Sequence, residues 1–169
     1  TLVGESAGGG IVSTLLASPA AEGLFSAAIA QSSPATSVYD AARSRGIAEQ
    51  VLGRLKTDTG GLADAPIAAI VAATKEVFNE VPSQSPGTLA FVPVVDGDVV
   101  PDYPVKLARE GRTLPVPLII GTNADEAALF RWMKSPLLPI TPEAIRVMFE
   151  SIAAEQPGHH IRQQALQPA

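Results

Sequence analysis

The most constraining feature of this sequence is a serine near its start that has glycine two positions away on each side. Residues 1–10 read Thr-Leu-Val-Gly-Glu-Ser-Ala-Gly-Gly-Gly, so a short apolar run ends in the motif Gly-x-Ser-x-Gly around Ser6. This motif is typical of a tight turn from a strand into a helix, which exposes the serine hydroxyl and leaves the following N–H group able to bind an oxyanion. Such a turn strains the backbone by about 1–3 kcal/mol, and we expect Gly4 and Gly8 to let the strand and helix cross closely. The motif predicts a catalytic serine, although a glycine-rich loop that only ends a strand would show the same five residues.

The composition indicates a globular domain, or part of one, and excludes several classes of partner. The chain has 169 residues, of which 46% are hydrophobic and 17% charged, enough apolar residues to bury a core. The net charge of −5 is spread without runs, so we expect neither nucleic acid nor an anionic membrane as partner. No apolar run is long enough to span a membrane. The absence of cysteine rules out disulfides and thiolate metal sites within this chain and favours a reducing compartment, the cytoplasm.

The two ends of the sequence lead us to expect a piece of a longer protein. The chain begins inside an expected strand, without an initiator methionine or a signal-like segment. Residues 161–169 carry no packing face.

Two apolar runs predict a buried parallel sheet beside Ser6. Phe25–Gln31 and Val116–Gly121 are short, apolar and bounded by turn residues, which is typical of parallel strands, although periodicity leaves a helix open for the first run. Apolar residues at helical spacing in 6–17 predict a helix that starts at Ser6. The positive end of its dipole would favour negative charge beside that serine.

A mainly helical region is expected between these strands. Apolar residues recur at helical spacing in Ile47–Leu55 and in Ile67–Val81, which predicts two amphipathic helices that form packing layers or part of a cap. The composition of residues 81–87 predicts a surface loop. Near the end of the chain, residues 141–143 (Thr-Pro-Glu) predict the start of a further helix.

An Asp-Gly pair inside residues 91–101 predicts a β-hairpin, because it lies between two short runs of β-branched residues. Asp96 and Asp98 also suggest calcium, but the remaining ligands of a calcium loop are absent, which favours turn chemistry. Residues 103–110 then predict a short helix closed by Gly111.

Two carboxylates follow the expected strand 116–121 and form the second candidate for chemistry. Asp125 and Glu126 come after Thr122-Asn123-Ala124, and in open parallel sheets the ligand crevice lies at the carboxyl ends of the strands. The alternative is structural: Asp125 caps a helix and Glu126 lies in its first turn.

Taken together, four blocks of sequence strongly resemble the type B carboxylesterases, especially bacterial members of the para-nitrobenzyl-esterase kind. The blocks occur in family order and are residues 1–10, residues 16–32 (Leu-Ala-Ser-Pro-Ala-Ala-Glu-Gly-Leu-Phe-Ser-Ala-Ala-Ile-Ala-Gln-Ser), residues 93–98 (Pro-Val-Val-Asp-Gly-Asp) and residues 121–126 (Gly-Thr-Asn-Ala-Asp-Glu). The resemblance implies an α/β-hydrolase fold, a mostly parallel sheet with flanking helices. Residues 1–169 would then be an incomplete, central part of the catalytic domain, with 38–90 as a mainly helical and loop insertion or cap-like region.

The resemblance also implies roles for individual residues. Ser6 becomes the nucleophile, Ala7 an N–H donor to the oxyanion, and Glu126 the acid of a catalytic triad. Chain order agrees, because nucleophile, acid and histidine follow one another in this fold. Asp125 becomes a helix cap or a support for the acid.

Other positions match the family less directly. Glu5 and Ser32 match positions in a polar network beneath the triad histidine, and Ala127 stands where glycine is usual. The family's glycine-rich oxyanion segment and its triad histidine fall outside this chain. His159 and His160 come too soon after the acid, and we do not expect either to be catalytic.

The resemblance implies a serine hydrolase that cleaves small carboxylic esters without a cofactor or metal. Two alternatives stay open: a non-catalytic binding or adhesion module of the same fold, and a lipase or amide hydrolase with the same chemistry. The oligomeric state is left open.

Overall fold

A computed structural model describes residues 1–85, 87–135, 137 and 141–155. The helices and strands of these residues follow in the order β1 (Leu2–Glu5), α1 (Ala7–Leu16), β2 (Ala28–Gln31), α2 (Ala41–Leu55), α3 (Ile67–Gln84), α4 (Pro104–Arg109), β3 (Leu118–Gly121), α5 (Ala128–Trp132) and α6 (Pro142–Glu155). Short 3₁₀ helices occupy Pro19–Ala21 and Gly61–Asp64.

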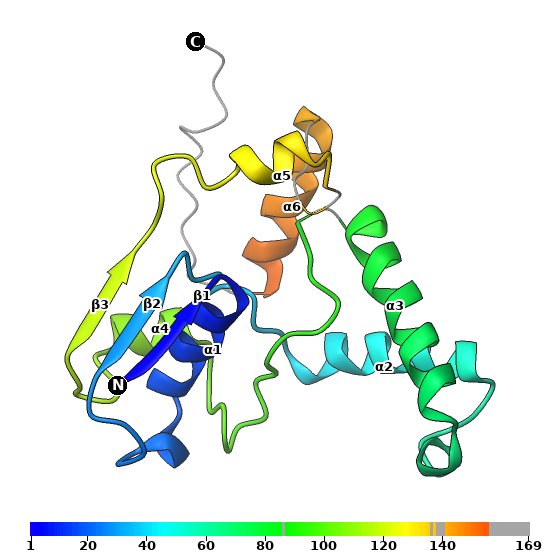
Figure 1. Ribbon diagram of the computed structural model, residues 1–169, viewed down its shortest axis with the longest axis horizontal. Coiled ribbons are helices and arrows are strands. Elements are labelled where there is room, and N and C mark those ends of the chain that lie inside the picture. The colour runs from blue at the N-terminus through cyan, green and yellow to red at the C-terminus, as the bar shows by residue number, and fades with distance from the viewer. Residues whose placement is uncertain (86, 136, 138–140, 156–169) are drawn as a thin grey trace.

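The sheet has three parallel strands in the order β1-β2-β3. The two predicted strands are confirmed, although each is shorter than its apolar run. Glu5, Gln31 and Gly121 are register partners and end their strands side by side. Because the strands are parallel, the segments that follow all three leave from one edge of the sheet (Figure 1).

The predicted helix α1 covers β1 and β2 on one face of this sheet, while Ile120 of β3, the register partner of Ala30, is 63% exposed. Val12 and Leu16 pack against Ala28 and Ala30, and all four side chains are buried. The small side chains of the central strand β2 bring the helix close to the sheet. The strand before the β1–α1 turn pairs with β2 and the helix after it packs on β2, so both ends of the turn are fixed.

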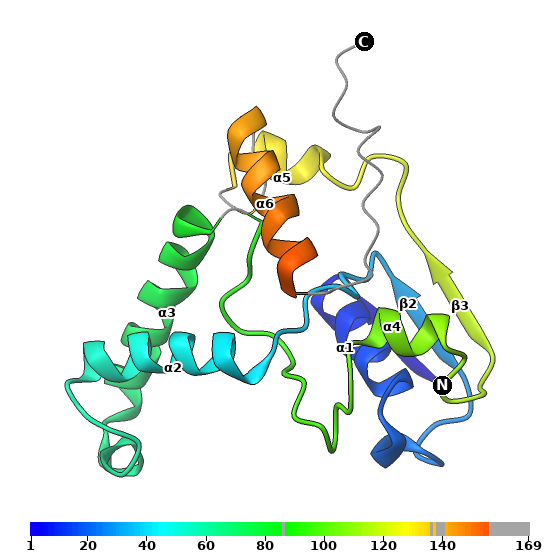
Figure 2. The same ribbon diagram turned by 180° about the vertical axis from the view of Figure 1, so that it is seen from behind.

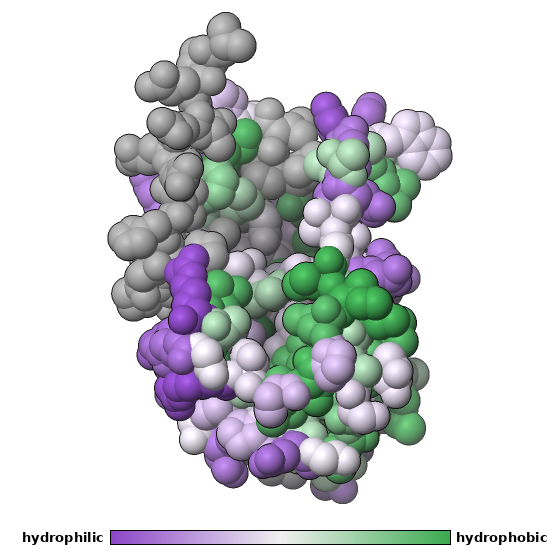
Figure 3. All heavy atoms as spheres, turned by 90° about the vertical axis from the view of Figure 1, so that its left-hand side faces the viewer, coloured by the Kyte–Doolittle hydropathy of each residue, from purple (hydrophilic) through white to green (hydrophobic). Residues whose placement is uncertain are grey.

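The opposite face of the sheet is apolar and open among the described residues. Val3 and Ile119 belong to one register row across the strands and are 59% and 67% exposed. Figure 3, viewed from the β3 side, shows apolar side chains gathered on this part of the molecule. Parallel sheets are normally covered on both faces, so within the described part of the chain this face lacks its usual cover.

Helices α2 and α3 form a second apolar core away from the sheet (Figures 1 and 2). Their buried residues are Ile47, Val51, Ala73, Val77 and Val81, joined by Ala90 from the segment after α3. Both predicted amphipathic helices are confirmed. The predicted surface loop 81–87 is wrong in its first half, because α3 continues to Gln84 through the buried Pro82. The free energy gained by burying Val81 in this core exceeds the cost of the helical hydrogen bond that Pro82, which has no N–H group, does not make.

The predicted hairpin in residues 91–101 is also wrong. The Asp96 carboxylate accepts the N–H groups of Asp98 and Val100, both at 2.9 Å, and forms a closed turn. Val94 makes a single parallel bridge to Tyr39 instead of pairing with the other arm. Prolines at both ends of the segment remove donors that a ladder needs. The same N–H groups hold the pKa of Asp96 below its ordinary value, and this supports the turn interpretation.

The remaining helix predictions agree with the structure where it is described. Helix α4 is closed by Gly111 at φ 69°, and the Thr141 hydroxyl accepts the N–H group of Ala144 at 3.2 Å where α6 starts. His159 and His160 lie outside the described residues. Within the described part of the chain, no helix has the length and apolar character needed to cross a membrane.

Candidate active site

Ser6 lies in the sharp turn between β1 and α1 and has a strained backbone. Its φ of 52° and ψ of −117° are unusual for a residue with a Cβ atom. Its N–H group donates to the carbonyl of Gln31 at 2.9 Å, and its carbonyl accepts from Gly10 at 3.0 Å. A serine at a helix start usually caps the helix with its side chain, but Ser6 makes no such bond. Its exposed hydroxyl therefore has no partner among the described residues.

Two glycines permit the close crossing of strand and helix at this turn. A Cβ atom on Gly4 would lie 2.2 Å from the carbonyl oxygen of Gly8, and one on Gly9 would lie 2.7 Å from that of Gln31. A Cβ atom on Gly8 would meet nothing within 4 Å among the described residues. The tight contacts thus fall on Gly4 and Gly9, where the motif points to Gly4 and Gly8.

The difference in space around Gly8 and Gly9 predicts different effects of alanine on stability at the two positions. We expect Gly9→Ala to lower the free energy of unfolding by about 1–3 kcal/mol, because the new methyl group meets backbone atoms. Gly8→Ala is the matched control and should keep or raise stability, since alanine is favoured over glycine in a helix by about 1 kcal/mol. Thermal unfolding of both variants measures the effect. Equal melting temperatures for the two variants would contradict this account of the turn.

The first N–H groups of α1 face the same site. Ala7 is the first residue of the helix, and its N–H group has no acceptor in the described part of the chain. Unpaired N–H groups and the helix dipole make such an end favourable for negative charge. The structure therefore offers, directly after Ser6, an N–H group that can donate a hydrogen bond to a negatively charged oxygen.

Glu126 lies in the turn that follows β3, and hydrogen bonds hold its carboxylate. The Asn123 N–H group donates to Oε1 at 2.7 Å, and the Asn123 side-chain amide lies 3.4 Å from Oε2. A hydrogen bond with the Ser32 hydroxyl is the largest cause of a pKa below the ordinary value for Glu126, followed by the Asn123 N–H group. Donors to the charged form favour ionisation, so this carboxylate is ionised at neutral pH.

This network predicts a shift that NMR can measure. Ser32→Ala removes the largest cause of the lowered pKa, so we expect the pKa of Glu126 to rise toward 4.5, its ordinary value. Because the folded-state pKa is lowered, the stabilisation from this group is present above the unfolded-state pKa and is lost as the pH falls through the folded-state pKa. A titration of the Glu126 side-chain carbon measures the shift. Ser26→Ala, at an exposed serine that precedes β2 and so lies at the opposite end of that strand from Ser32, is the control, and an unchanged or lower pKa in Ser32→Ala would contradict the network.

Ser32 is the second strained residue at this edge of the sheet. Its φ is 49°, and its N–H group donates to the carbonyl of Gly121 at 2.8 Å. Ser6 and Ser32 each follow a register partner, Glu5 and Gln31, and so occupy neighbouring strand ends. Left-handed residues other than glycine cost about 1–3 kcal/mol each and gather at functional sites.

The structure treats the other two predicted support residues differently. Asp125 does not cap α5, because that helix begins at Ala128 after Ala127 with no side-chain cap. The Asp125 carboxylate instead lies 3.5 Å from the guanidinium of Arg131. The Glu5 side chain is exposed and makes no hydrogen bond or ion pair with a described residue, so it does not join the network of Ser32 and Glu126. Asn123 does join it and is absent from the predicted site.

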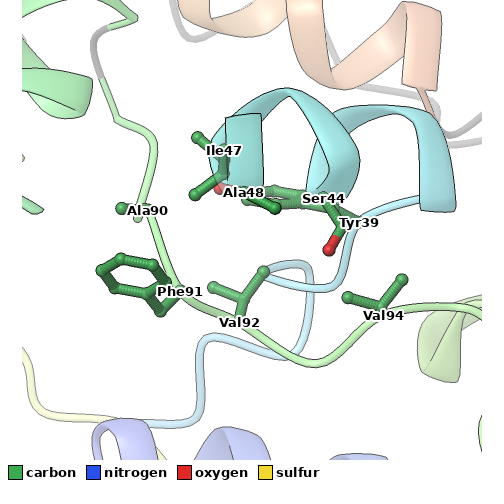
Figure 4. A pocket seen from close by; sticks show the side chains of 8 residues that line it. All are labelled: Tyr39, Ser44, Ile47, Ala48, Ala90, Phe91, Val92 and Val94. Atoms are coloured by element: carbon green, nitrogen blue, oxygen red, sulfur yellow. The ribbon is translucent and has the colours of Figure 1, made fainter. Parts of the chain in front are cut away.

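A cavity of about 170 Å³ lies elsewhere, between α2 and the segment after α3 (Figure 4). It is mostly apolar, and its lining residues are Tyr39, Ser44, Ile47, Ala48, Ala90, Phe91, Val92 and Val94. None of the predicted site residues lines it. Among the described residues, no three histidine, cysteine or acidic side chains gather as a metal site would require.

Comparisons with known proteins agree on one family. A family model described as the carboxylesterase family matches residues 1–158. The chain is 36% identical over 140 residues to the para-nitrobenzyl esterase of Bacillus subtilis (strain 168), covering 77% of this chain and 27% of that protein. It is 33% identical over 131 residues to neuroligin-2 of Homo sapiens, covering 77% of this chain and 16% of that protein.

A solved structure of a carboxylesterase from Geobacillus stearothermophilus matches the fold with a TM-score of 0.67. The two are 26% identical, and the match covers 97% of this chain and 32% of that chain. The chain thus spans between about a sixth and a third of the length of these relatives.

Proposed function

Because this chain belongs to the carboxylesterase family, we propose that the protein hydrolyses carboxylic esters through an acyl-enzyme, with Ser6 as the nucleophile and Glu126 as the acid of its triad. The described sheet and its helices are part of an α/β-hydrolase fold. The observation that best supports this proposal is that Ser6 and Glu126 lie at the same edge of the sheet. There the hydroxyl of Ser6, which has no partner among the described residues, and the ionised carboxylate of Glu126 both follow parallel strands.

The first half of the proposed reaction forms the acyl-enzyme. A histidine takes the proton of the Ser6 hydroxyl while the Ser6 oxygen bonds to the ester carbonyl carbon. The Ala7 N–H group donates to the carbonyl oxygen as it gains negative charge, supported by the dipole of α1. The intermediate then expels the alcohol, which leaves with the proton from the imidazolium.

The second half releases the acid. Water gives a proton to the same histidine and attacks the acyl carbon, and the Ser6 oxygen leaves with that proton. Glu126 orients the imidazole and stabilises its charged form in both halves. We place this histidine outside residues 1–169, because the family resemblance puts it well beyond Glu126.

We also propose that residues 1–169 are part of a larger catalytic domain. The open apolar face of the sheet, with Val3 and Ile119 exposed, supports this. Residues 38–90, which include α2, α3 and their own core, form a mainly helical, cap-like region in this proposal.

A non-catalytic binding module is the rival function. The similarity to neuroligin-2, a relative not named as an esterase, supports it. A module without catalysis has no need for a strained serine and a hydrogen-bonded carboxylate at the same edge of a sheet, so Ser6 and Glu126 favour the enzyme.

The hydrolysis of a short-chain activated ester tests the proposed function. We expect turnover by the full-length protein and at least about 10³-fold less by residues 1–169 alone, which lack the histidine and most oxyanion donors in this proposal. Strong turnover by residues 1–169 that is lost in His159→Ala or His160→Ala would contradict the placement of the base. No turnover by the full-length protein across short-chain esters would favour the binding module.

A further inference from the structure

Asn123 contacts both oxygens of the Glu126 carboxylate and the hydroxyl beside it. Its N–H group donates to Oε1 at 2.7 Å, while its side-chain amide nitrogen lies 3.4 Å from Oε2 and 3.4 Å from the Ser32 hydroxyl. The three residues come from the ends of two neighbouring strands, β2 and β3. A single side chain therefore joins the turn after β3 to the strained residue after β2.

The donors and acceptors of this group match without conflict. A carboxylate only accepts, and an amide nitrogen carries two hydrogens, one for each oxygen that it faces. Ser32 can accept from Asn123 and donate its own hydrogen to Glu126, in agreement with the hydrogen bond that lowers the pKa of that carboxyl group. An aspartate at position 123 has the same shape but would place acceptors against acceptors.

Packing does not hold the Glu126 side chain. Glu126 and Asn123 are both exposed in the described structure, so hydrogen bonds are what restrain the carboxylate among the described residues. An acid that orients a histidine must present one oxygen in a fixed direction. Loss of the amide would leave Oε2 with one donor fewer.

We propose that Asn123 is a positioning residue that fixes the Glu126 carboxylate against Ser32 for the triad. The inference rests on the proposed function, because it assigns Asn123 a role in the same reaction. Asn123 acts only through Glu126, so its effect should vanish when Glu126 can no longer act.

A double-mutant cycle in the full-length protein tests this dependence. We expect Asn123→Ala to lower kcat about tenfold with little change in KM, and Asn123→Asp to lower it at least as much because like charges face each other. In a Glu126→Gln background, Asn123→Ala should change kcat less than about twofold, since residues that act as one unit are not additive. Asn79→Ala, an exposed asparagine on α3, is the matched control and should leave both backgrounds unchanged.

The outcomes separate this inference from the proposed function. Equal losses from Asn123→Ala in both backgrounds, or full activity of both Asn123 variants, would overturn the positioning role while leaving Glu126 as the acid. Full activity of Glu126→Gln alone would overturn the role of Glu126 and this inference together. The isosteric Asn123→Asp variant keeps the test decisive if the alanine variant fails to fold, as shown by its melting temperature.

Discussion

Replacement of Ser6 by alanine in the full-length protein is expected to lower kcat for a short-chain ester by about 10⁴-fold or more. The hydroxyl oxygen of Ser6 is the atom that bonds to the acyl group in the proposed reaction, so its loss removes the covalent route entirely. Binding of the ester depends on other groups, and KM should change much less. Steady-state kinetics with a chromogenic ester measures both constants.

Two features make this prediction specific to Ser6. Its hydroxyl has no partner among the described residues and does not cap α1, so alanine removes no described hydrogen bond and the fold should stay intact. Ser26→Ala, at an exposed serine before β2, is the control and should keep full turnover. A Ser6→Ala protein that is folded and retains kcat within tenfold of the native value would contradict the nucleophile assignment.

Replacement of Glu126 by glutamine is expected to have the second largest effect, a loss of about 10³–10⁴-fold in kcat. Glutamine has nearly the same shape but no charge, so it does not stabilise the imidazolium. Only one of its two terminal side-chain atoms, the oxygen, can accept a hydrogen bond. The present carboxylate accepts from the Asn123 N–H group at 2.7 Å, and a glutamine amide group turned toward that donor would meet it with a second donor. The loss should persist at all pH values at which the native enzyme works, because glutamine does not ionise.

The matched control is Glu22→Gln, an exposed glutamate that follows the short helix Pro19–Ala21. This variant should keep native kinetics. A Glu126→Gln enzyme with kcat within tenfold of the native enzyme would show that another group orients the base.

Local patterns predicted the frame of the candidate site from the sequence. The glycine spacing around Ser6 and the apolar runs before Gln31 and Gly121 predict a turn at the edge of a parallel sheet, and the structure has this sheet. Such patterns succeed because strand, turn and helix are each determined by neighbouring residues. The nucleophile and acid roles of Ser6 and Glu126 remain proposals.

Features set by distant contacts were not predictable. Pro82 lies within α3 because the neighbouring Val81 is buried in the core shared with α2. The segment 91–101 closes only a turn around Asp96 and makes its bridge to Tyr39, without pairing its two arms as strands. Both outcomes depend on partners remote in sequence, which periodicity does not report.

Two residues of the candidate site were missed for the same reason. Gly9 is needed because its Cβ position faces the carbonyl of Gln31, a contact across two elements. Asn123 joins Ser32 and Glu126 across two strand ends. Asn123 belongs to the block 121–126 that carries the family resemblance, but an asparagine in a turn after a strand is common in ordinary turns, so its type alone does not indicate this role.

Covalent labelling of the full-length protein tests the central claim most directly. A fluorophosphonate probe reacts with a serine that is activated as a nucleophile, and mass spectrometry locates the adduct. We predict one adduct on the peptide that contains Ser6, absent from Ser6→Ala and strongly slowed in Glu126→Gln. Failure of the native protein to react, or labelling that persists in Ser6→Ala, would contradict the account.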